Sequence, residues 1–224
     1  MTKHLDRDME QLHRDILSLS AIVEEMIANA GRSLCEGRLD LAEKVILDDE
    51  FVDQHEVTIE EECLKMLALH HPVATDLRRI ATVIKVNNDL ERIADLAVNV
   101  AQRAIGVGDY PRFVIPDEVG PMVGKVTAMV RNALDAFVNM DTIAAKQVIL
   151  GDDEVDRLNA ELIAWLRRVM QTDSQLVVAA LHCFSAIRHL ERIADLATNI
   201  AEDAIYLVDG EIVRHRSVTI KNAR

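Results

Sequence analysis

Leu90-Glu91-Arg92-Ile93-Ala94-Asp95-Leu96-Ala97-Val98-Asn99-Val100-Ala101 is the stretch that decides the fold, because it occurs twice in the chain. Residues 190–201 repeat it with two changes, Val98 to Thr198 and Val100 to Ile200. A helix turns once in about 3.6 residues, so Glu91, Asp95 and Asn99 form one stripe along a single helix face. In the second copy the stripe consists of Glu191, Asp195 and Asn199.

The stripe points away from the apolar side of its helix, where Ile93, Leu96 and Val100 cluster. One interpretation is a solvated face on which Arg92 compensates Asp95. However, like charges four residues apart cost about 0.2–0.5 kcal/mol, which a cation between the carboxylates would remove. The two copies also keep Glu, Asp and Asn while their Val and Ile residues exchange, which favours a functional stripe over a merely solvated one.

The composition favours an all-α protein with a sizeable core. Half of the 224 residues are hydrophobic, only 3% are aromatic, and the chain holds four Pro and eight Gly. A formal net charge of −13 disfavours nucleic acid and anionic membranes as direct partners.

The N-terminal residues lack a signal peptide's apolar core, and no run approaches a membrane span, so we expect a soluble cytoplasmic protein without direct membrane insertion. Cys35, Cys63 and Cys183 lie in apolar periodic stretches and are expected to be reduced, buried and structural.

Apolar periodicity predicts three helices in the first half, over about 5–35, 40–69 and 72–105. Gly37 and Asp40 supply the first turn, with Asp40 as a plausible N-cap, and His70-His71-Pro72 interrupts before the third helix, whose first turn accepts the proline. Turn formers between Gly106 and Pro116 mark the boundary between the halves.

A second triple is predicted over about 117–140, 141–170 and 173–208, ended by Gly210. The chain is therefore expected to be a tandem repeat of two three-helix bundles, with six long helices. The domains are 1–106 for the first bundle, 107–116 for the linker and 117–224 for the second bundle.

The middle helix of each half carries a further acidic pair, Asp49 with Asp53 and Asp152 with Asp156. If the middle and third helices are neighbours, each half can assemble four carboxylates with Asn99 or Asn199 at the edge. Oxygen ligands without His or Cys suit hard cations such as Fe³⁺, Mn²⁺, Mg²⁺ or Ca²⁺. Glu56 and Glu60 extend the first stripe but have no acidic counterpart in the second half, so they are interpreted as solvated.

Two alternatives remain beside a metal-binding adaptor. A ferritin-like metal oxidase or storage protein needs two Glu-x-x-His motifs, and only Glu10 with His13 fits, without a repeat partner. The second alternative is a helical scaffold, in which the acidic stripes only keep the protein soluble. The chain shows no Gly-rich phosphate loop, nucleophile elbow or nucleophile with a recognisable base, so no catalytic residue and no enzymatic activity are expected.

The sequence resembles the PhoU family of bacterial phosphate-transport regulators over nearly its whole length. The resemblance rests on Lys3-His4-Leu5, His71-Pro72-Val73-Ala74-Thr75-Asp76-Leu77-Arg78, both Leu-Glu-Arg-Ile-Ala-Asp segments and the stretch 199–210 followed by Arg214-His215. Many members carry Gly where this chain has Ala94 and Ala194, which affects close packing more than ligation.

The resemblance implies two repeated three-helix bundles with surface metal clusters, which hold iron in some members; manganese, magnesium or calcium are the alternatives. Carried over by position, the metal ligands are Asp49, Asp53, Glu91, Asp95, Asn99, Asp152, Asp156, Glu191, Asp195 and Asn199. The resemblance further implies a negative regulator of phosphate uptake and phosphate-starvation signalling. Its partners would be the ATPase subunit of the phosphate ABC transporter and a phosphate-sensing histidine kinase, and homodimers are common among its relatives.

Overall fold

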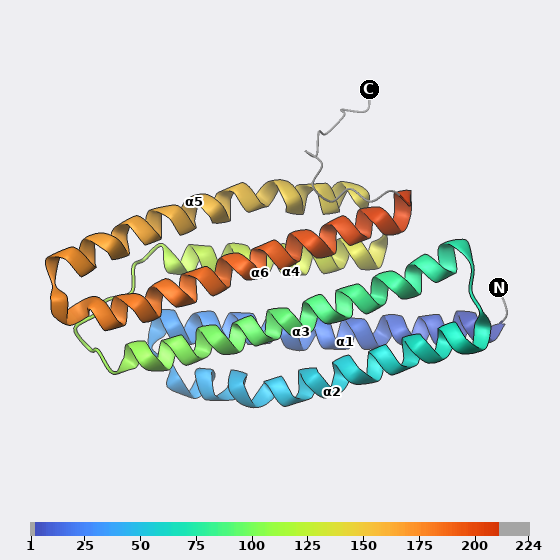
Figure 1. Ribbon diagram of the computed structural model, residues 1–224, viewed down its shortest axis with the longest axis horizontal. Helices are drawn as coiled ribbons and strands as arrows, with labels where there is room; N and C mark the ends of the chain where they lie inside the picture. The colour runs from blue at the N-terminus through green and yellow to red at the C-terminus, as the bar shows by residue number, and fades with distance from the viewer. Residues whose placement is uncertain (1–2, 211–224) are drawn as a thin grey trace, which may run out of the picture.

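The computed structural model describes residues 3–210, which form long helices and no strand. The elements are α1 (Lys3–Glu36), α2 (Leu39–His70), α3 (Ala74–Gly108), α4 (Val119–Asn139), α5 (Thr142–Thr172), a short 3-10 helix η1 (Ser174–Leu176) and α6 (Val177–Asp209) (Figure 1). The prediction of an all-α protein with six long helices is confirmed. None of the described helices is long and apolar enough to cross a membrane.

Local sequence signals explain three of the helix ends. Gly37 adopts a positive φ of 68° between α1 and α2, and Gly210 does so with 73° after α6, a conformation that glycine adopts without steric cost. Asp141 caps α5, because its carboxylate accepts the backbone N–H groups of Ile143 and Ala144 at 2.9 and 3.0 Å.

Two expected details of the helix starts are wrong. Asp40 is not the N-cap of α2, because the helix begins at Leu39 and the Asp40 carboxylate pairs instead with Arg38, 2.6 Å away. Pro72 is not in the first turn of α3 either, since the helix begins at Ala74. His71 takes a left-handed conformation with φ 45°, so the chain reverses before the proline rather than at it.

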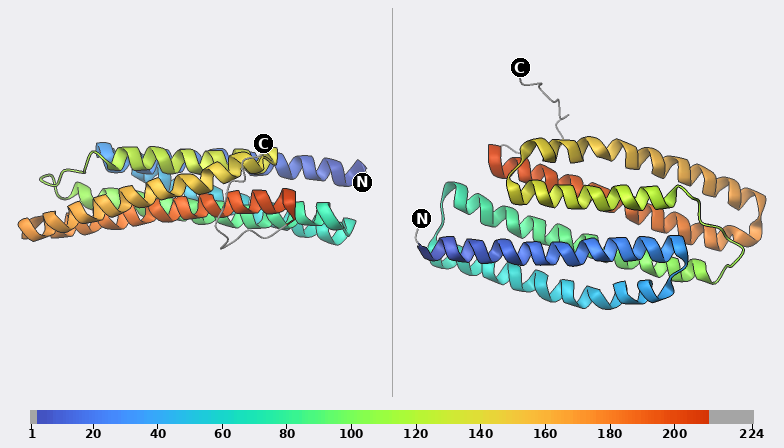
Figure 2. Two further views of the ribbon diagram at one scale, coloured as in Figure 1. Left: turned by 90° about the horizontal axis from the view of Figure 1, so that it is seen from above. Right: turned by 180° about the vertical axis from the view of Figure 1, so that it is seen from behind.

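The helices form two layers, with the two repeats side by side (Figures 1 and 2). The helices α3 and α6 run antiparallel along the middle of the molecule, flanked by α2 and α5 respectively, while α1 and α4 lie behind them. The halves are therefore related by an approximate two-fold axis. Corresponding positions in α3 and α6 are 100 residues apart in the sequence.

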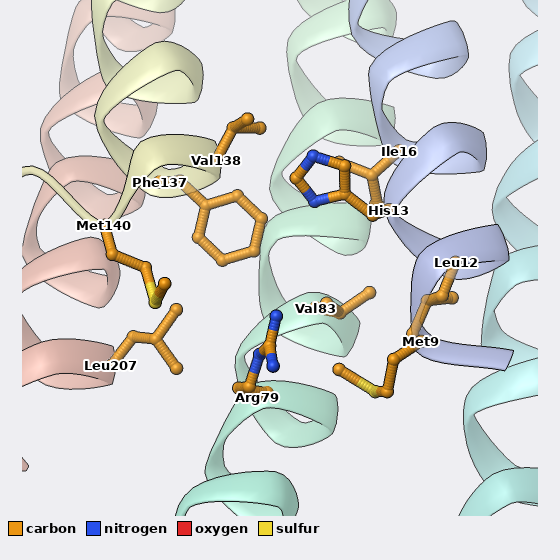
Figure 3. A pocket seen from close by; sticks show the side chains of 10 residues that line it. All are labelled: Met9, Leu12, His13, Ile16, Arg79, Val83, Phe137, Val138, Met140 and Leu207. Atoms are coloured by element: carbon orange, nitrogen blue, oxygen red, sulfur yellow. The ribbon is translucent and has the colours of Figure 1, made fainter. Parts of the chain in front are cut away.

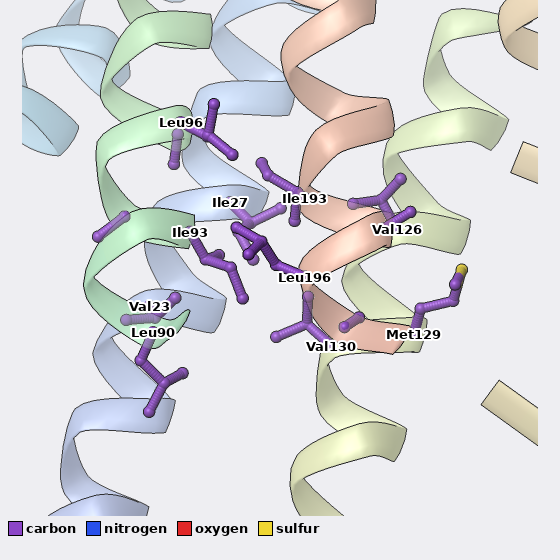
Figure 4. Packing of buried hydrophobic residues seen from close by; sticks show 14 of the residues in the cluster. Val23, Ile27, Leu90, Ile93, Leu96, Val126, Met129, Val130, Ile193 and Leu196 are labelled. Carbon is purple, nitrogen blue, oxygen red and sulfur yellow. The ribbon is translucent and has the colours of Figure 1, made fainter. Parts of the chain in front are cut away.

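The repeats share one hydrophobic core rather than two separate ones. Leu96 of α3, Leu196 of α6 and Val130 of α4 are among its buried members and lie where the repeats meet (Figure 4). Two ion pairs also connect the halves: Arg131 of α4 contacts Glu24 of α1 at 2.7 Å, and Lys85 of α3 contacts Asp203 of α6 at 2.9 Å. The Asp203 side chain is only 3% exposed, whereas the Lys85 side chain is 43% exposed, so the second pair lies at the edge of the interface with its carboxylate buried.

The expectation that all three cysteines are buried is wrong for one of them. Cys63 and Cys183 are buried, whereas Cys35 is exposed near the end of α1. The inward position there is occupied by Leu34, which is 3% exposed, and the next residue is rotated by about 100° toward solvent.

Candidate functional site

The repeated stripe has the same environment in both halves. Glu91 and Glu191 are half-buried, Asp95 and Asp195 are exposed, and the two asparagines are half-buried. The residues between them at 93, 94, 96 and 97, and their counterparts, are buried. Each stripe therefore runs along the outer edge of its helix's buried face, as the helical projection predicts.

In the first repeat, α2 and α3 bring their acidic pairs together. Burial raises the pKa of Asp49, and the negative charges of Asp53 on its own helix and of Asp95 on α3 raise it further. The pKa of Glu91 is raised by burial first and then by Asp95 and by Asp53 across the helix interface. The four carboxylates therefore repel one another across two helices.

Glu56 also belongs to this group, although it was interpreted as solvated. Its side chain is half-buried, and burial followed by the charges of Glu60 and Asp53 raises its pKa. It also acts on Glu91. The second repeat has Asn159 at the corresponding position, so the first acidic group carries one more carboxylate than the second.

The second repeat repeats the arrangement on α5 and α6. Burial together with the charges of Asp156, Asp195 and Glu191 raises the pKa of Asp152 to about 6. Burial and Asp156 likewise raise the pKa of Asp195, although Arg188 and Arg192 oppose this effect. The Oε2 atom of Glu191 is buried and has no hydrogen-bond partner among the described residues.

The donor set fits a hard cation, because crowded carboxylates lacking a counter-charge are stabilised by one. In the part of the chain that the structure describes, no three Asp, Glu, His or Cys side chains are arranged as a ready-made metal site. Binding would therefore require side-chain rotation of the carboxylates around the ion. The same ten side chains, from Asp49 to Asn199, remain the predicted ligands.

Both stripes border one groove between α3 and α6, which sequence reasoning did not anticipate. The groove has a volume of about 350 Å³. Its lining consists of four corresponding pairs: Arg92 and Arg192, Asp95 and Asp195, Leu96 and Leu196, Asn99 and Asn199. The sequence does show that an arginine directly follows the glutamate of each motif. It does not show that α3 and α6 pack together, so it could not predict the groove.

The arginines of the motif do not compensate the carboxylates as the helical spacing suggests. Arg92 contacts Asp89 at 3.8 Å and forms no ion pair with Asp95 within the described residues. In the second repeat, Arg188 donates to Glu191 at 3.0 Å. Neither Asp95 nor Asp195 forms an ion pair within 4 Å among the described residues, although the charges of Arg188 and Arg192 act on Asp195.

Glu10 and His13, on which the ferritin-like alternative depends, lie exposed on α1. His13 borders a small, mostly apolar pocket with Arg79, Phe137 and Leu207 (Figure 3). None of the acidic groups described above lines this pocket. The structure thus gives the ferritin-like interpretation no second set of ligands near Glu10 and His13.

The fold and the site define a class: helical proteins of two fused three-helix repeats, each presenting an acidic stripe beside a shared groove. The PhoU domain matches the chain twice, over residues 16–104 and 119–204. The chain belongs to the PhoU family.

Its relatives are similar over almost their whole length. The phosphate-specific transport system accessory protein PhoU homolog of Aquifex aeolicus is 38% identical over 217 residues, which cover 97% of this chain and 98% of the relative. The homolog of Pseudomonas aeruginosa is 37% identical over 222 residues, which cover 98% of this chain and 91% of the relative.

Solved structures agree with this fold. The crystal structure of PhoU from Pseudomonas aeruginosa superposes with a TM-score of 0.89 at 36% identity, covering 92% of this chain and 99% of that chain. The phosphate transport system regulatory protein PhoU from Streptococcus pneumoniae superposes with a TM-score of 0.87 at 26% identity, covering 93% and 99%.

Proposed function

We propose that this chain is a cytoplasmic, non-enzymatic regulator of phosphate transport that represses phosphate-starvation genes when phosphate is plentiful. The observation that supports this most strongly is the full-length similarity to proteins named as phosphate-transport accessory proteins. In this proposal the protein couples the ATPase subunit of the phosphate ABC transporter to a phosphate-sensing histidine kinase.

The regulatory role is tested by deleting the gene and measuring transcripts of phosphate-scavenging genes at high phosphate. We expect derepression that the wild-type gene reverses. Normal repression in the deletion strain would rule out this role. Binding to the purified ATPase subunit and to the kinase's cytoplasmic part then separates the two partners, and sedimentation equilibrium tests the proposed homodimer.

The acidic groups are proposed to hold hard cations, with iron first and manganese, magnesium or calcium as alternatives. The supporting observation is that two sets of crowded carboxylates recur at corresponding places with raised pKa values, and that Arg188 is the one base that pairs directly with a member of either set among the described residues. A bound cation would neutralise their repulsion and join the middle helix of each repeat to its third helix.

Metal content measured by plasma mass spectrometry tests this part of the proposal. We expect the Asp95→Ala/Asp195→Ala variant to lose most of the metal that wild type carries, while its circular dichroism remains helical. The matched control is Glu50→Ala/Asp153→Ala, which removes exposed acids at corresponding positions of α2 and α5 that are not predicted ligands. Equal metal content in all three proteins after resupply would contradict the ligand assignment.

The ferritin-like alternative predicts ferroxidase turnover that depends on Glu10 and His13. Under the regulator proposal, Glu10→Ala/His13→Ala keeps the metal content of wild type, and Fe²⁺ oxidation is no faster than in buffer. Turnover that this variant abolishes would instead favour the alternative.

A further inference from the structure

A pocket lies where four helices from both repeats meet. Its walls come from α1 and α3 of the first repeat and from α4 and α6 of the second (Figure 3). It lies at the end of α4, where Met140 takes a left-handed φ of 53° and the helix stops, while α1 extends past this end (Figure 2). Most of the lining is apolar, and Val83, Phe137 and Leu207 are among its buried members.

One charged side chain points into this apolar pocket. Figure 3 shows Arg79 of α3 directed toward the middle of the lining, between Met9 and Val83 on one side and Leu207 and Met140 on the other. Arg79 is half-buried and forms no hydrogen bond or ion pair within residues 3–210. None of the residues that line the pocket is acidic. A guanidinium group held against apolar walls without a counter-charge is unfavourable, so the pocket favours an anion.

A packing role does not account for Arg79. Its neighbour Arg78 lies against Gly210 at the end of α6, where the helix dipole favours a cation. One hundred residues from Arg79, the corresponding residue of α6 is Ala179, which is completely buried. The repeat therefore accommodates a small apolar side chain at this position.

A second polar group borders the pocket from the opposite side. The His13 ring on α1 lies near Ile16 and Phe137 in Figure 3, and it forms no hydrogen bond or ion pair with another described residue. A histidine ring carries at least one N–H donor in either tautomer. The pocket thus combines an unpaired guanidinium group and an N–H donor with apolar walls, which is the complement of a small anion with an apolar body.

The size of the pocket restricts the ligand further. Its volume of about 30 Å³ is too small for a segment of polypeptide. Met9 and Met140 lie on its sides, and unbranched thioether side chains move readily to admit a few more carbon atoms. A phosphate ion fits less well than a carboxylate, because its additional oxygens would face apolar walls.

We propose that a monocarboxylate with a short alkyl chain, such as butyrate, binds in this pocket. The carboxylate accepts paired N–H donors from Arg79, and the alkyl chain packs against Val83, Phe137 and Leu207. The walls belong to both repeats, so the bound ligand connects α1 and α3 to α4 and α6. The pocket shares no residue with the predicted metal ligands, so its test is independent of the proposed regulatory function.

Methyl NMR of the full-length protein, with ¹³C-labelled methionine methyl groups, tests this proposal. Sodium butyrate replaces sodium chloride at constant ionic strength. We expect saturable shifts of the Met9 and Met140 resonances and none for Met66, which is buried on α2 outside the pocket. Acetate should bind more weakly, by about two- to fourfold for each carbon removed, because less apolar surface is buried.

Arg79→Met keeps the apolar stem and removes the charge, so it should weaken butyrate binding at least tenfold. The matched control is Arg14→Met, which removes an exposed cation of α1 outside the lining and should change the affinity by less than twofold. An unchanged Met66 resonance shows that each variant is folded. Undiminished butyrate binding by Arg79→Met, or equal weakening in Arg14→Met, would overturn the proposal.

A comparison on the wild-type protein depends on no variant. Butan-1-ol and butylamine carry the same alkyl chain without a carboxylate, so both should bind at least tenfold more weakly than butyrate. If the alcohol or the amine binds as tightly as butyrate, or if butyrate leaves the Met9 and Met140 resonances unshifted, the pocket is not a carboxylate site.

Discussion

At the scale of single residues, the carboxylates of each acidic group repel one another in the folded protein. Asp152 shows it most clearly, with a pKa raised from 3.8 to about 6 by burial and four neighbouring carboxylates. Between those two pH values the folded protein binds more protons at this site than the unfolded chain does. Lowering the pH from 7 toward 5 therefore favours the folded state through Asp152.

This leads to a pH-dependent prediction for the chelator-treated protein. Asp152→Asn should unfold at a higher temperature than wild type at pH 7, by roughly 2–4 °C if the relieved repulsion is about 1 kcal/mol. The difference should shrink at pH 5, where wild type gains the proton. Differential scanning calorimetry at both pH values measures it.

Glu50→Gln is the control, because Glu50 is an exposed acid of the first repeat and is not among the charges that raise the pKa of Asp152. The ion-paired carboxylates of Asp8, Asp40, Glu25 and Glu154 have lowered pKa values, so their contribution to stability is lost only at more acidic pH. If the difference in unfolding temperature between Asp152→Asn and wild type is the same at pH 7 and pH 5, the raised pKa of Asp152 is not its cause.

At the scale of elements, the approach of α1 to α4 depends on a glycine. Gly31 is buried within α1, and a Cβ atom added there would overlap the Val123 side chain of α4. This contact lets the second layer close over α3 and α6. Gly124, one residue along α4, faces open space instead.

Gly31→Ala should therefore destabilise the protein by about 1–3 kcal/mol, because the two helices must separate or Val123 must shift. Gly124→Ala should be neutral or stabilising by up to about 1 kcal/mol, since alanine is the better helix former. Urea unfolding of both variants measures the two effects. Adding Val123→Ala to Gly31→Ala should recover part of the loss; no recovery would show that the overlap is not the cause.

At the scale of the whole molecule, the repeats form one cooperative unit. They share a continuous core, and the Lys85–Asp203 pair connects α3 of one repeat to α6 of the other. A protein built this way should unfold in one transition, because neither half retains a complete core without its neighbour.

Lys85→Met tests this connection. Leaving the nearly inaccessible Asp203 carboxylate without its lysine should cost about 1–3 kcal/mol, whereas Lys44→Met, at an exposed pair with Glu25, should cost less than about 1 kcal/mol. Calorimetry should show a single transition that moves as a whole in Lys85→Met. Separation into two transitions would mean that the repeats unfold independently.

Much of the fold could be predicted from the sequence, because helix positions follow from local periodicity and the repeat follows from comparing the chain with itself. The stripes of Glu91 and Glu191 lie on the helix edge where the 3.6-residue period places them. Errors occurred where a residue's surroundings depend on a distant or alternative partner. Cys35 is exposed, Arg92 pairs with Asp89, and Glu56 lies against the acidic group of the first repeat.

The sequence by itself determined the helices, their duplication and the residue types of both acidic stripes, since each depends on short-range spacing within one helix. Only the tertiary structure decided that α3 and α6 pack antiparallel and that both stripes border a single groove. Periodicity establishes which face of a helix is apolar. The partner and register of that face depend on packing across the whole core, between residues about a hundred positions apart.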